Sequence, residues 1–164
     1  MKKASAFFMV FCVGCVFSCG QDVRNISSKE GFEMLKKSAT YLVDVRTIAE
    51  YVYVGHPVMA SNIPLLFWME REQDRIQNPN FLEDVKSLFK TDDTLILICR
   101  SGVRSVTAYR MLEKAGFKNV YNIKNGFEGG RDENGYRSMS GWKNNGLAYN
   151  YNLDVKLIYK FPEK

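Results

Sequence analysis

The sequence predicts an α/β fold in which a mostly parallel sheet is covered by helices on both faces. Short β-branched runs alternate along the chain with longer amphipathic stretches, a pattern typical of parallel strands joined by crossover helices. The most strand-like run, Thr94–Ile98, has no polar alternation. This indicates that both faces of the strand are covered, as they are inside a parallel sheet.

Before this central run, the chain is expected to form three helices and one strand. Ser27 or Ser28 can cap the first helix, since a hydroxyl oxygen accepts a hydrogen bond from a free amide of the first turn. The β-branched run at residues 41–45 predicts a buried strand. The other expected segments are the first helix near residues 29–38, a brief helical or extended stretch at 50–54, a turn at 62–64, and helices at 65–75 and 81–89.

After the central run, the expected pattern is a helix, a strand and a glycine-rich region. Residues 103–115 are expected to form a helix that Gly116 closes, because glycine readily adopts the left-handed conformation at this position. A short strand is expected at residues 119–123. The remaining segments are a glycine-rich and polar stretch at 125–146, with a short helix near 139–143, and a final strand within 149–159.

The composition limits the classes of protein to which the chain can belong. Its 164 residues suit one domain, and the contents of 46% hydrophobic and 25% charged residues exclude a disordered chain. Four cysteines are too few for a disulfide scaffold. The one histidine, His56, argues against a histidine-rich metal site, and the net charge of +5 is spread along the chain.

The N-terminal residues have the pattern of an export signal. A positive start, Met1–Lys3, precedes the apolar run Ala6–Phe17, whose 12 residues are too few to span a bilayer as a free helix. The run ends at Val16-Phe17-Ser18-Cys19, which resembles the lipobox of bacterial lipoproteins. The resemblance implies cleavage before Cys19, lipid on its thiol, and an exported protein anchored to a membrane of the cell envelope. The alternatives are an ordinary cleaved signal and an uncleaved anchor.

This interpretation divides the chain into a signal peptide (residues 1–18), a tether (19–27) and one folded domain (28–164). Loss of Lys2 and Lys3 with the signal reduces the 23 basic residues to 21 against 18 acidic residues. The resulting charge of +3 argues against a nucleic-acid partner. Cys99 then remains as the one free thiol of the domain. A lone thiol in an exported protein is either inert or reactive, and its surroundings decide which.

The segment that begins at Cys99 has the features of a reactive-thiol site. It reads Cys-Arg-Ser-Gly-Val-Arg-Ser, starts where the central strand ends and leads into a helix N-terminus. Ligands of open α/β sheets bind at the carboxyl ends of strands, and the free amides of a helix N-terminus attract anions. Gly102 lets the backbone curl so that several amides point at one anionic atom, while Arg100 and Arg104 add positive charge. We therefore expect Cys99 to be a nucleophile held as the thiolate.

This segment resembles the active-site loop of the single-domain rhodaneses, the thiosulfate sulfurtransferase family. Further motifs follow in the family's order, among them Leu42–Arg46 and, towards the C-terminus, Gly126–Gly129 and Gly141–Lys143. The resemblance covers residues 28–148, most of the expected domain. It implies a rhodanese-like domain with a mostly parallel, five-stranded sheet and helices on both faces.

The chain also departs from the family pattern. Pro57 and Met59 replace the usual residues after the Gly-His motif, and the stretch at residues 65–89 is longer than in minimal members. The cysteine loop is unaffected, so the departures concern the shape of the substrate site. Three side chains of the longer stretch are expected either near the pocket mouth or in the core: Phe67, Trp68 and Met69.

The resemblance implies sulfur transfer, with Cys99 and Arg104 as the catalytic residues. The Cys99 thiolate would attack the outer sulfur of thiosulfate or another sulfane donor, sulfite would leave, and the persulfide would pass its sulfur to cyanide or a thiol. Arg104 would bind the anionic donor. The loop residues implied to hold the substrate are Arg100, Ser101, Gly102, Val103 and Ser105. Asp44 and Arg46 would support the loops, His56 would be a hydrogen-bonded loop residue, and neither a metal nor a cofactor is implied.

Two other functions remain open. Cysteine phosphatases and arsenate reductases also place a cysteine at a strand end, but their loop reads C-x5-R, whereas four residues separate Cys99 from Arg104. A shorter loop forms a narrower cradle, which suits one sulfur atom better than an oxyanion with four oxygens. The other alternative is a persulfide carrier or binding module for a protein partner. Small sulfur donors and acceptors are otherwise the expected partners.

Overall fold

The computed structural model describes residues 22–68 and 75–161. The signal peptide predicted at residues 1–18, the lipid site predicted at Cys19 and the residue Met69 lie outside the described residues. Within the two described ranges, no helix combines the length and the apolar character that crossing a membrane requires.

A five-stranded sheet forms the centre of the domain, and every neighbouring pair of its strands is parallel. In the order in which they lie across the sheet, the strands are β1 (Asn25–Ile26), β8 (Asn119–Ile123), β7 (Thr94–Ile98), β2 (Thr40–Asp44) and β4 (Ser61–Asn62). The predicted parallel sheet is thus confirmed, with β7 as its central strand. Residues 95–98 of β7 are completely buried, as the absence of polar alternation indicated.

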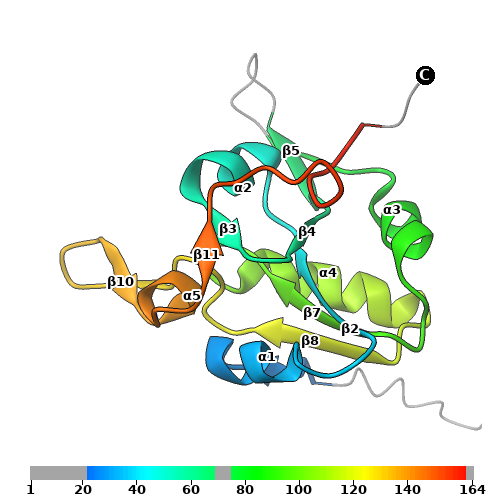
Figure 1. Ribbon diagram of the computed structural model, residues 1–164, viewed down its shortest axis with the longest axis horizontal. Helices are drawn as coiled ribbons and strands as arrows, with labels where there is room; N and C mark the ends of the chain where they lie inside the picture. Colours follow the sequence, from blue (N-terminus) through cyan, green and yellow to red (C-terminus); the bar gives the residue numbers. More distant parts are fainter. Residues whose placement is uncertain (1–21, 69–74, 162–164) are drawn as a thin grey trace, which may run out of the picture.

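Helices cover both faces of this sheet, as predicted (Figure 1). One face carries α3 (Phe81–Leu88) and α4 (Val103–Lys114), and the other carries α1 (Ser28–Met34), α2 (Ile48–Val54) and α5 (Gly141–Asn144). Leu95 and Leu97 of β7 pack in the first of these hydrophobic cores, and Ile96 and Ile98 pack in the second. Alternate side chains of one strand therefore contribute to two separate cores.

The ends of several helices follow from local residues. Ser27 caps α1 and Thr47 caps α2. In each cap the hydroxyl accepts a hydrogen bond from the amide three residues later, and the glutamate at that position, Glu30 or Glu50, bonds back to the cap amide. Gly116 follows the end of α4 with a φ of 94°, the left-handed conformation expected there.

The prediction of a helix at residues 65–75 is wrong. β5 (Leu66–Trp68) and β6 (Arg75–Gln77) instead form an antiparallel pair. The ring of Phe67 in β5 packs against that of Phe161, with 5.2 Å between the centroids. Phe161 belongs to the C-terminal segment, far from β5 in the sequence. The residues next to β5 therefore do not predict this contact, which helps to stabilise its extended conformation.

Three further segments differ from the prediction. β1 lies within the stretch predicted as a tether, the final strand is limited to β11 (Tyr149–Asn150), which pairs with β3 (His56–Pro57), and a hairpin of β9 (Gly130–Arg131) and β10 (Arg137–Met139) lies in the glycine-rich region. Beyond β11 the chain crosses the edge of the main sheet, where the amide of Asn62 donates to the carbonyl of Leu157 at 2.7 Å. β1 and β11 pair with strands that are distant in the sequence, whereas β9 and β10 pair across a short turn.

Candidate active site

The Cys99 thiol lies directly after β7, at the carboxyl end of the central strand. The residue is buried, with 1% of its surface exposed. Its Sγ atom accepts two hydrogen bonds, from the amide of Gly102 at 3.1 Å and from the hydroxyl of Ser105 at 3.2 Å. Two donors therefore point at one sulfur atom beside a helix N-terminus, a setting that suits an anionic atom.

Two glycines allow the cysteine loop to lie against the neighbouring backbone. Gly102 has a φ of 93°, and a Cβ atom there would lie 1.9 Å from the carbonyl oxygen of Lys124. A Cβ atom on Gly126 would lie 2.3 Å from the carbonyl oxygen of Cys99. Neither position has room for a side chain, so both glycines determine the path of the loop.

The segment after β8 is hydrogen-bonded to the backbone of the cysteine loop. The amide of Phe127 donates to the carbonyl of Cys99 at 2.7 Å, and the amide of Glu128 donates to the carbonyl of Arg100 at 3.0 Å. The buried ring of Phe127 in turn packs against the guanidinium of Arg46, whose centre lies 4.3 Å from the ring centroid. The loop therefore rests on a well-packed support.

The second arginine of the loop, Arg104, forms a two-armed ion pair with Glu50. Nη1 lies 2.7 Å from Oε2 and Nη2 lies 2.6 Å from Oε1, and the two side chains are only 13% and 21% exposed. Thr47, the cap of α2, donates to the same carboxylate from its amide and its hydroxyl. The ion pair between Glu50 and Arg104 was not predicted. The neighbouring sequence of Glu50 indicates only its other role, in the capping box with Thr47.

These contacts govern the charge states of the pair. Burial raises the pKa of Glu50, but the hydrogen bonds and charge of Arg104, together with the bonds from Thr47, outweigh burial and lower that pKa to about 2. Burial lowers the pKa of Arg104, but hydrogen bonding to Glu50 and its charge act in the opposite direction, and the net shift is upward. Both groups are therefore ionised at neutral pH, and Arg104 is a fixed cation beside the cysteine loop.

Two more guanidinium groups lie near Cys99. The Nε atom of Arg100 is buried and has no hydrogen-bond partner within the described part of the chain. Arg137, in β10, donates from Nη1 to the carbonyl of Gly129 at 2.6 Å. Burial and the positive charge of Arg100 lower the pKa of Arg137, whereas the charges of Glu128 and Cys99 act in the opposite direction. Arg137 was not predicted as a site residue, because nothing in its local sequence connects it with the cysteine loop.

Asp44 and Arg46 form a fully buried ion pair at the carboxyl end of β2. Nη2 of Arg46 lies 2.6 Å from Oδ2 of Asp44 and also donates to the carbonyl of Gly55 at 2.8 Å. The amide group of Asn62 donates to the backbone carbonyls of both residues. Both ring nitrogens of buried His56 lie near backbone carbonyl oxygens, at 3.0 and 3.1 Å. These contacts hold together the loops that follow β2 and α2.

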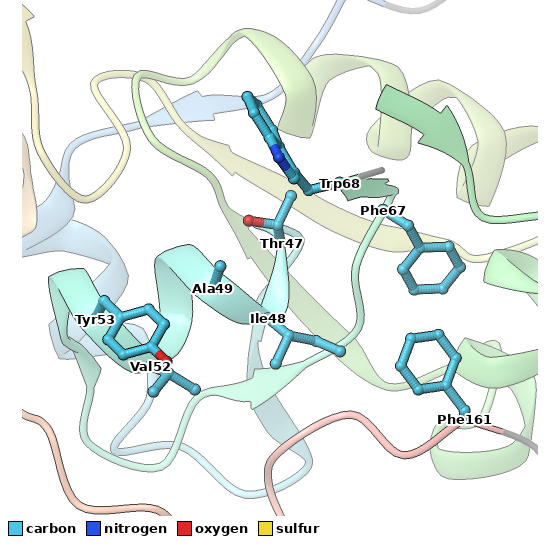
Figure 2. Close-up of a pocket in the computed structure, with 8 residues that line it drawn as sticks. All are labelled: Thr47, Ile48, Ala49, Val52, Tyr53, Phe67, Trp68 and Phe161. Carbon is cyan, nitrogen blue, oxygen red and sulfur yellow. The ribbon is translucent and has the colours of Figure 1, made fainter. Parts of the chain in front are cut away.

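A separate hollow of about 500 Å³ lies beside α2 (Figure 2). Its walls come from α2, from β5 and from the C-terminal segment, and Phe67 and Phe161 lie side by side on one wall. Phe67 and Trp68 therefore line this hollow, whereas Cys99 is not among its lining residues. Thr47 belongs to the wall and also donates to Glu50, so the hollow adjoins the support of Arg104.

The described residues offer no metal site. Within residues 22–68 and 75–161, no three side chains of His, Cys, Asp or Glu are grouped closely enough to hold a metal ion. The polar groups around Cys99 are instead guanidinium groups, a backbone amide and a hydroxyl. Such a set of donors and cations suits an anion.

Comparisons with known proteins agree with this geometry. Residues 27–133 match the family model described as the rhodanese-like domain. The chain is 34% identical over 130 residues to an uncharacterized protein of Rickettsia prowazekii, a match that covers 79% of this chain and 98% of the relative. It is 33% identical over 107 residues to thiosulfate sulfurtransferase 18 of Arabidopsis thaliana, covering 65% of this chain and 77% of the relative. The crystal structure of Rv0390 from M. tuberculosis aligns with a TM-score of 0.71 at 30% identity, covering 80% of this chain and 100% of that one.

Proposed function

Because this chain belongs to the rhodanese-like domain family, we propose that it is a sulfurtransferase with Cys99 as its nucleophile. The donor is thiosulfate or a similar carrier of sulfane sulfur, and the acceptor is cyanide or a thiol. The observation that carries the proposal is the pair of hydrogen bonds that Sγ accepts from the Gly102 amide and the Ser105 hydroxyl. These bonds support a thiolate at a helix N-terminus, and a thiolate is the reactive form of cysteine.

The reaction proceeds in two half-reactions. In the first, Sγ of Cys99 attacks the outer sulfur of thiosulfate, a bond forms between these two sulfur atoms, and sulfite departs with the electron pair of the broken donor bond. Cys99 then holds a persulfide. In the second, cyanide attacks the terminal sulfur, thiocyanate leaves, and the electron pair returns to Sγ as the thiolate. This division of the transfer gives ping-pong kinetics.

The loop after Cys99 contributes the rest of the chemistry in this proposal. The amides of residues 100–105 cradle the terminal sulfur of the persulfide. Arg104, held in place by Glu50, supplies a fixed positive charge for the dianionic donor and for the departing sulfite. The buried pair of Asp44 and Arg46 keeps the neighbouring loops in position.

The test is the intact mass of the full chain after incubation with thiosulfate, measured beside Cys99→Ser. We expect a gain of about 32 Da, one sulfur atom, that cyanide removes and that Cys99→Ser never shows. The other three cysteines, Cys12, Cys15 and Cys19, are present in both proteins and cancel in the comparison. A wild-type protein that gains no sulfur, although its Cys99 is rapidly alkylated, would contradict the proposal. Hydrolysis of an aryl phosphate by that protein would then favour a cysteine phosphatase.

A further inference from the structure

The hairpin of β9 and β10 holds a cation close to the cysteine loop. The amides of residues 127–128 donate to the carbonyls of Cys99 and Arg100, and the carbonyl of the next residue, Gly129, accepts the bond from Arg137 at 2.6 Å. Three consecutive residues thus fix the Arg137 guanidinium relative to the loop. In Figure 1 the arrowhead of β8 points towards the side of the molecule on which β10 lies, which is the side of the strands' carboxyl ends.

No ion pair within residues 22–68 and 75–161 neutralises this cation. Among the residues that the structure describes, Arg100 and Arg137 form no salt bridge, and Glu50 is taken up by Arg104. Asp132 lies in the turn of the same hairpin, but its carboxylate accepts hydrogen bonds from two amides of the turn and from the hydroxyl of Ser138 in β10. Glu128 is the carboxylate whose charge acts on Arg137, and it offsets one of the two positive charges of Arg100 and Arg137, so positive charge beside Cys99 remains in excess.

Such an excess of charge is unfavourable unless an anion binds to it. Like charges that are held close together repel, and burial adds to the cost. Both effects act on Arg137, whose pKa is lowered by burial and by the positive charge of Arg100. Arg100 also has a buried Nε atom without a hydrogen-bond partner in the described part of the chain. An oxyanion between the two guanidinium groups would relieve the repulsion.

We propose that Arg137 and Arg100 together bind the acidic group of the sulfur donor, which makes Arg137 a specificity-determining residue. This inference rests on the proposed function. The cysteine loop holds the sulfur that is transferred, whereas the hairpin binds the sulfonate or carboxylate beside it. The favoured donors are therefore those in which an acidic group accompanies the sulfane sulfur, and uncharged donors lose this contact.

The test compares two donors on the full chain carrying Arg137→Gln: thiosulfate, which is a dianion, and diallyl trisulfide, which is uncharged. The rate of Cys99 modification is followed by mass. With thiosulfate the product is the Cys99 persulfide and sulfite leaves, whereas with the trisulfide the product is a mixed disulfide carrying one allyl group and allyl persulfide leaves. We expect the rate with thiosulfate to fall about 10- to 100-fold, and the rate with the trisulfide to change less than about threefold. Arg137→Lys keeps the charge, so its rate with thiosulfate should lie between the rates of the wild type and of Arg137→Gln. Arg110→Gln, on the exposed side of α4, is the matched control.

Equal losses with both donors, or no loss with either, would overturn the inference. Partial unfolding cannot mimic the expected result, because it lowers both rates in the same variant. Calorimetric binding of thiosulfate to Cys99→Ser, with and without Arg137→Gln, separates this inference from the proposed function. If Arg137→Gln weakens binding about tenfold while the wild type forms no persulfide, the anion site stands and the proposed function fails. If persulfide forms and binding is unchanged, the anion site fails and the proposed function stands.

Discussion

Arg104 and Glu50 lie 54 residues apart in the sequence and are joined by a two-armed ion pair, with 2.7 Å from Nη1 to Oε2 and 2.6 Å from Nη2 to Oε1. The pair connects the first turn of α4 with the first turn of α2. The planar guanidinium matches the carboxylate, which gives the contact a defined geometry. Because the cysteine loop leads directly into α4, a residue of α2 helps to position the loop.

Replacing Glu50 with glutamine should make the stability of the protein less dependent on pH in the acid range. The pKa of Glu50 is about 2 in the folded protein, against an ordinary value of 4.5. The carboxylate therefore stabilises the fold fully above pH 4.5 and progressively less as the pH falls towards 2. The difference corresponds to roughly 3 kcal/mol at neutral pH. Urea unfolding of the wild type and of Glu50→Gln, at about pH 7 and about pH 3, measures this difference in the free energy of unfolding.

We expect the free energy of unfolding of the wild type to exceed that of Glu50→Gln at neutral pH, and the gap to narrow in acid. Glu33→Gln is the matched control, because Glu33 pairs with Lys36 on the surface of α1 with both side chains more than half exposed. The free energy of unfolding of Glu33→Gln should be less than about 0.5 kcal/mol below that of the wild type at either pH. A gap for Glu50→Gln that is equally large in acid would contradict the assigned charge state.

Removing the hydroxyl of Ser105 should slow the reactions of Cys99. The hydroxyl oxygen lies 3.2 Å from Sγ and 3.1 Å from the carbonyl of Gly102, and its one proton turns to the sulfur when the sulfur is charged. We expect Ser105→Ala to slow alkylation of Cys99 at neutral pH about tenfold, measured by peptide mass. Ser87→Ala, which removes an exposed hydroxyl bonded to a carbonyl of α3, should leave the rate unchanged. A normal rate in Ser105→Ala would rule out this role.

Two glycines with nearly the same positive φ angle should respond differently to replacement by alanine. Gly102 and Gly116 have φ angles of 93° and 94°. A Cβ atom on Gly102 would lie 1.9 Å from a carbonyl oxygen, whereas one on Gly116 would meet nothing within 4 Å. Gly116→Ala should therefore cost about 1 kcal/mol, from the left-handed conformation alone. Gly102→Ala should cost more than about 3 kcal/mol and displace the cysteine loop, and equal losses in thermal unfolding would refute this distinction.

Cys19 is proposed to carry lipid. Expressed in a bacterial host with an alkynyl fatty acid, the full chain should incorporate the label, because the segment before Cys19 resembles a lipobox. Cys19→Ser should abolish the label. Cys15→Ser should retain it, since Cys12 occupies the upstream position where a lipobox has an aliphatic residue. A labelled Cys19→Ser protein would exclude Cys19 as the lipid site.

Much of the fold around Cys99 could be predicted from neighbouring residues alone. β7 and β8 have the bounds that their β-branched runs predicted, and Gly116 follows α4 as expected. Strand composition, helix capping and the left-handed glycine all depend on residues that are adjacent in the chain, so they leave a local pattern. The order of the cysteine loop after β7 and before α4 follows from the same pattern.

Contacts between distant residues could not be predicted in this way. The pattern of residues 65–75 suggested a helix, yet β5 is extended because Phe67 packs on an aromatic ring of the C-terminal segment. Helix preferences amount to only a few tenths of a kcal/mol per residue, so strand pairing with β6 together with the contact of the partly buried Phe67 ring prevails over them. The residues around Arg137 likewise do not predict that its hairpin lies near the cysteine loop.

Residues that are adjacent in the chain specify where the cysteine loop begins, which strand precedes it and how it enters α4. Long-range packing specifies which charged groups lie around the thiol: Arg104 held by Glu50 across 54 residues, and Arg137 held by Gly129 near the loop. Strands, caps and turns are specified by neighbours in the chain. Ion pairs and cation clusters form between residues that only the packing of helices and hairpins around the sheet brings together.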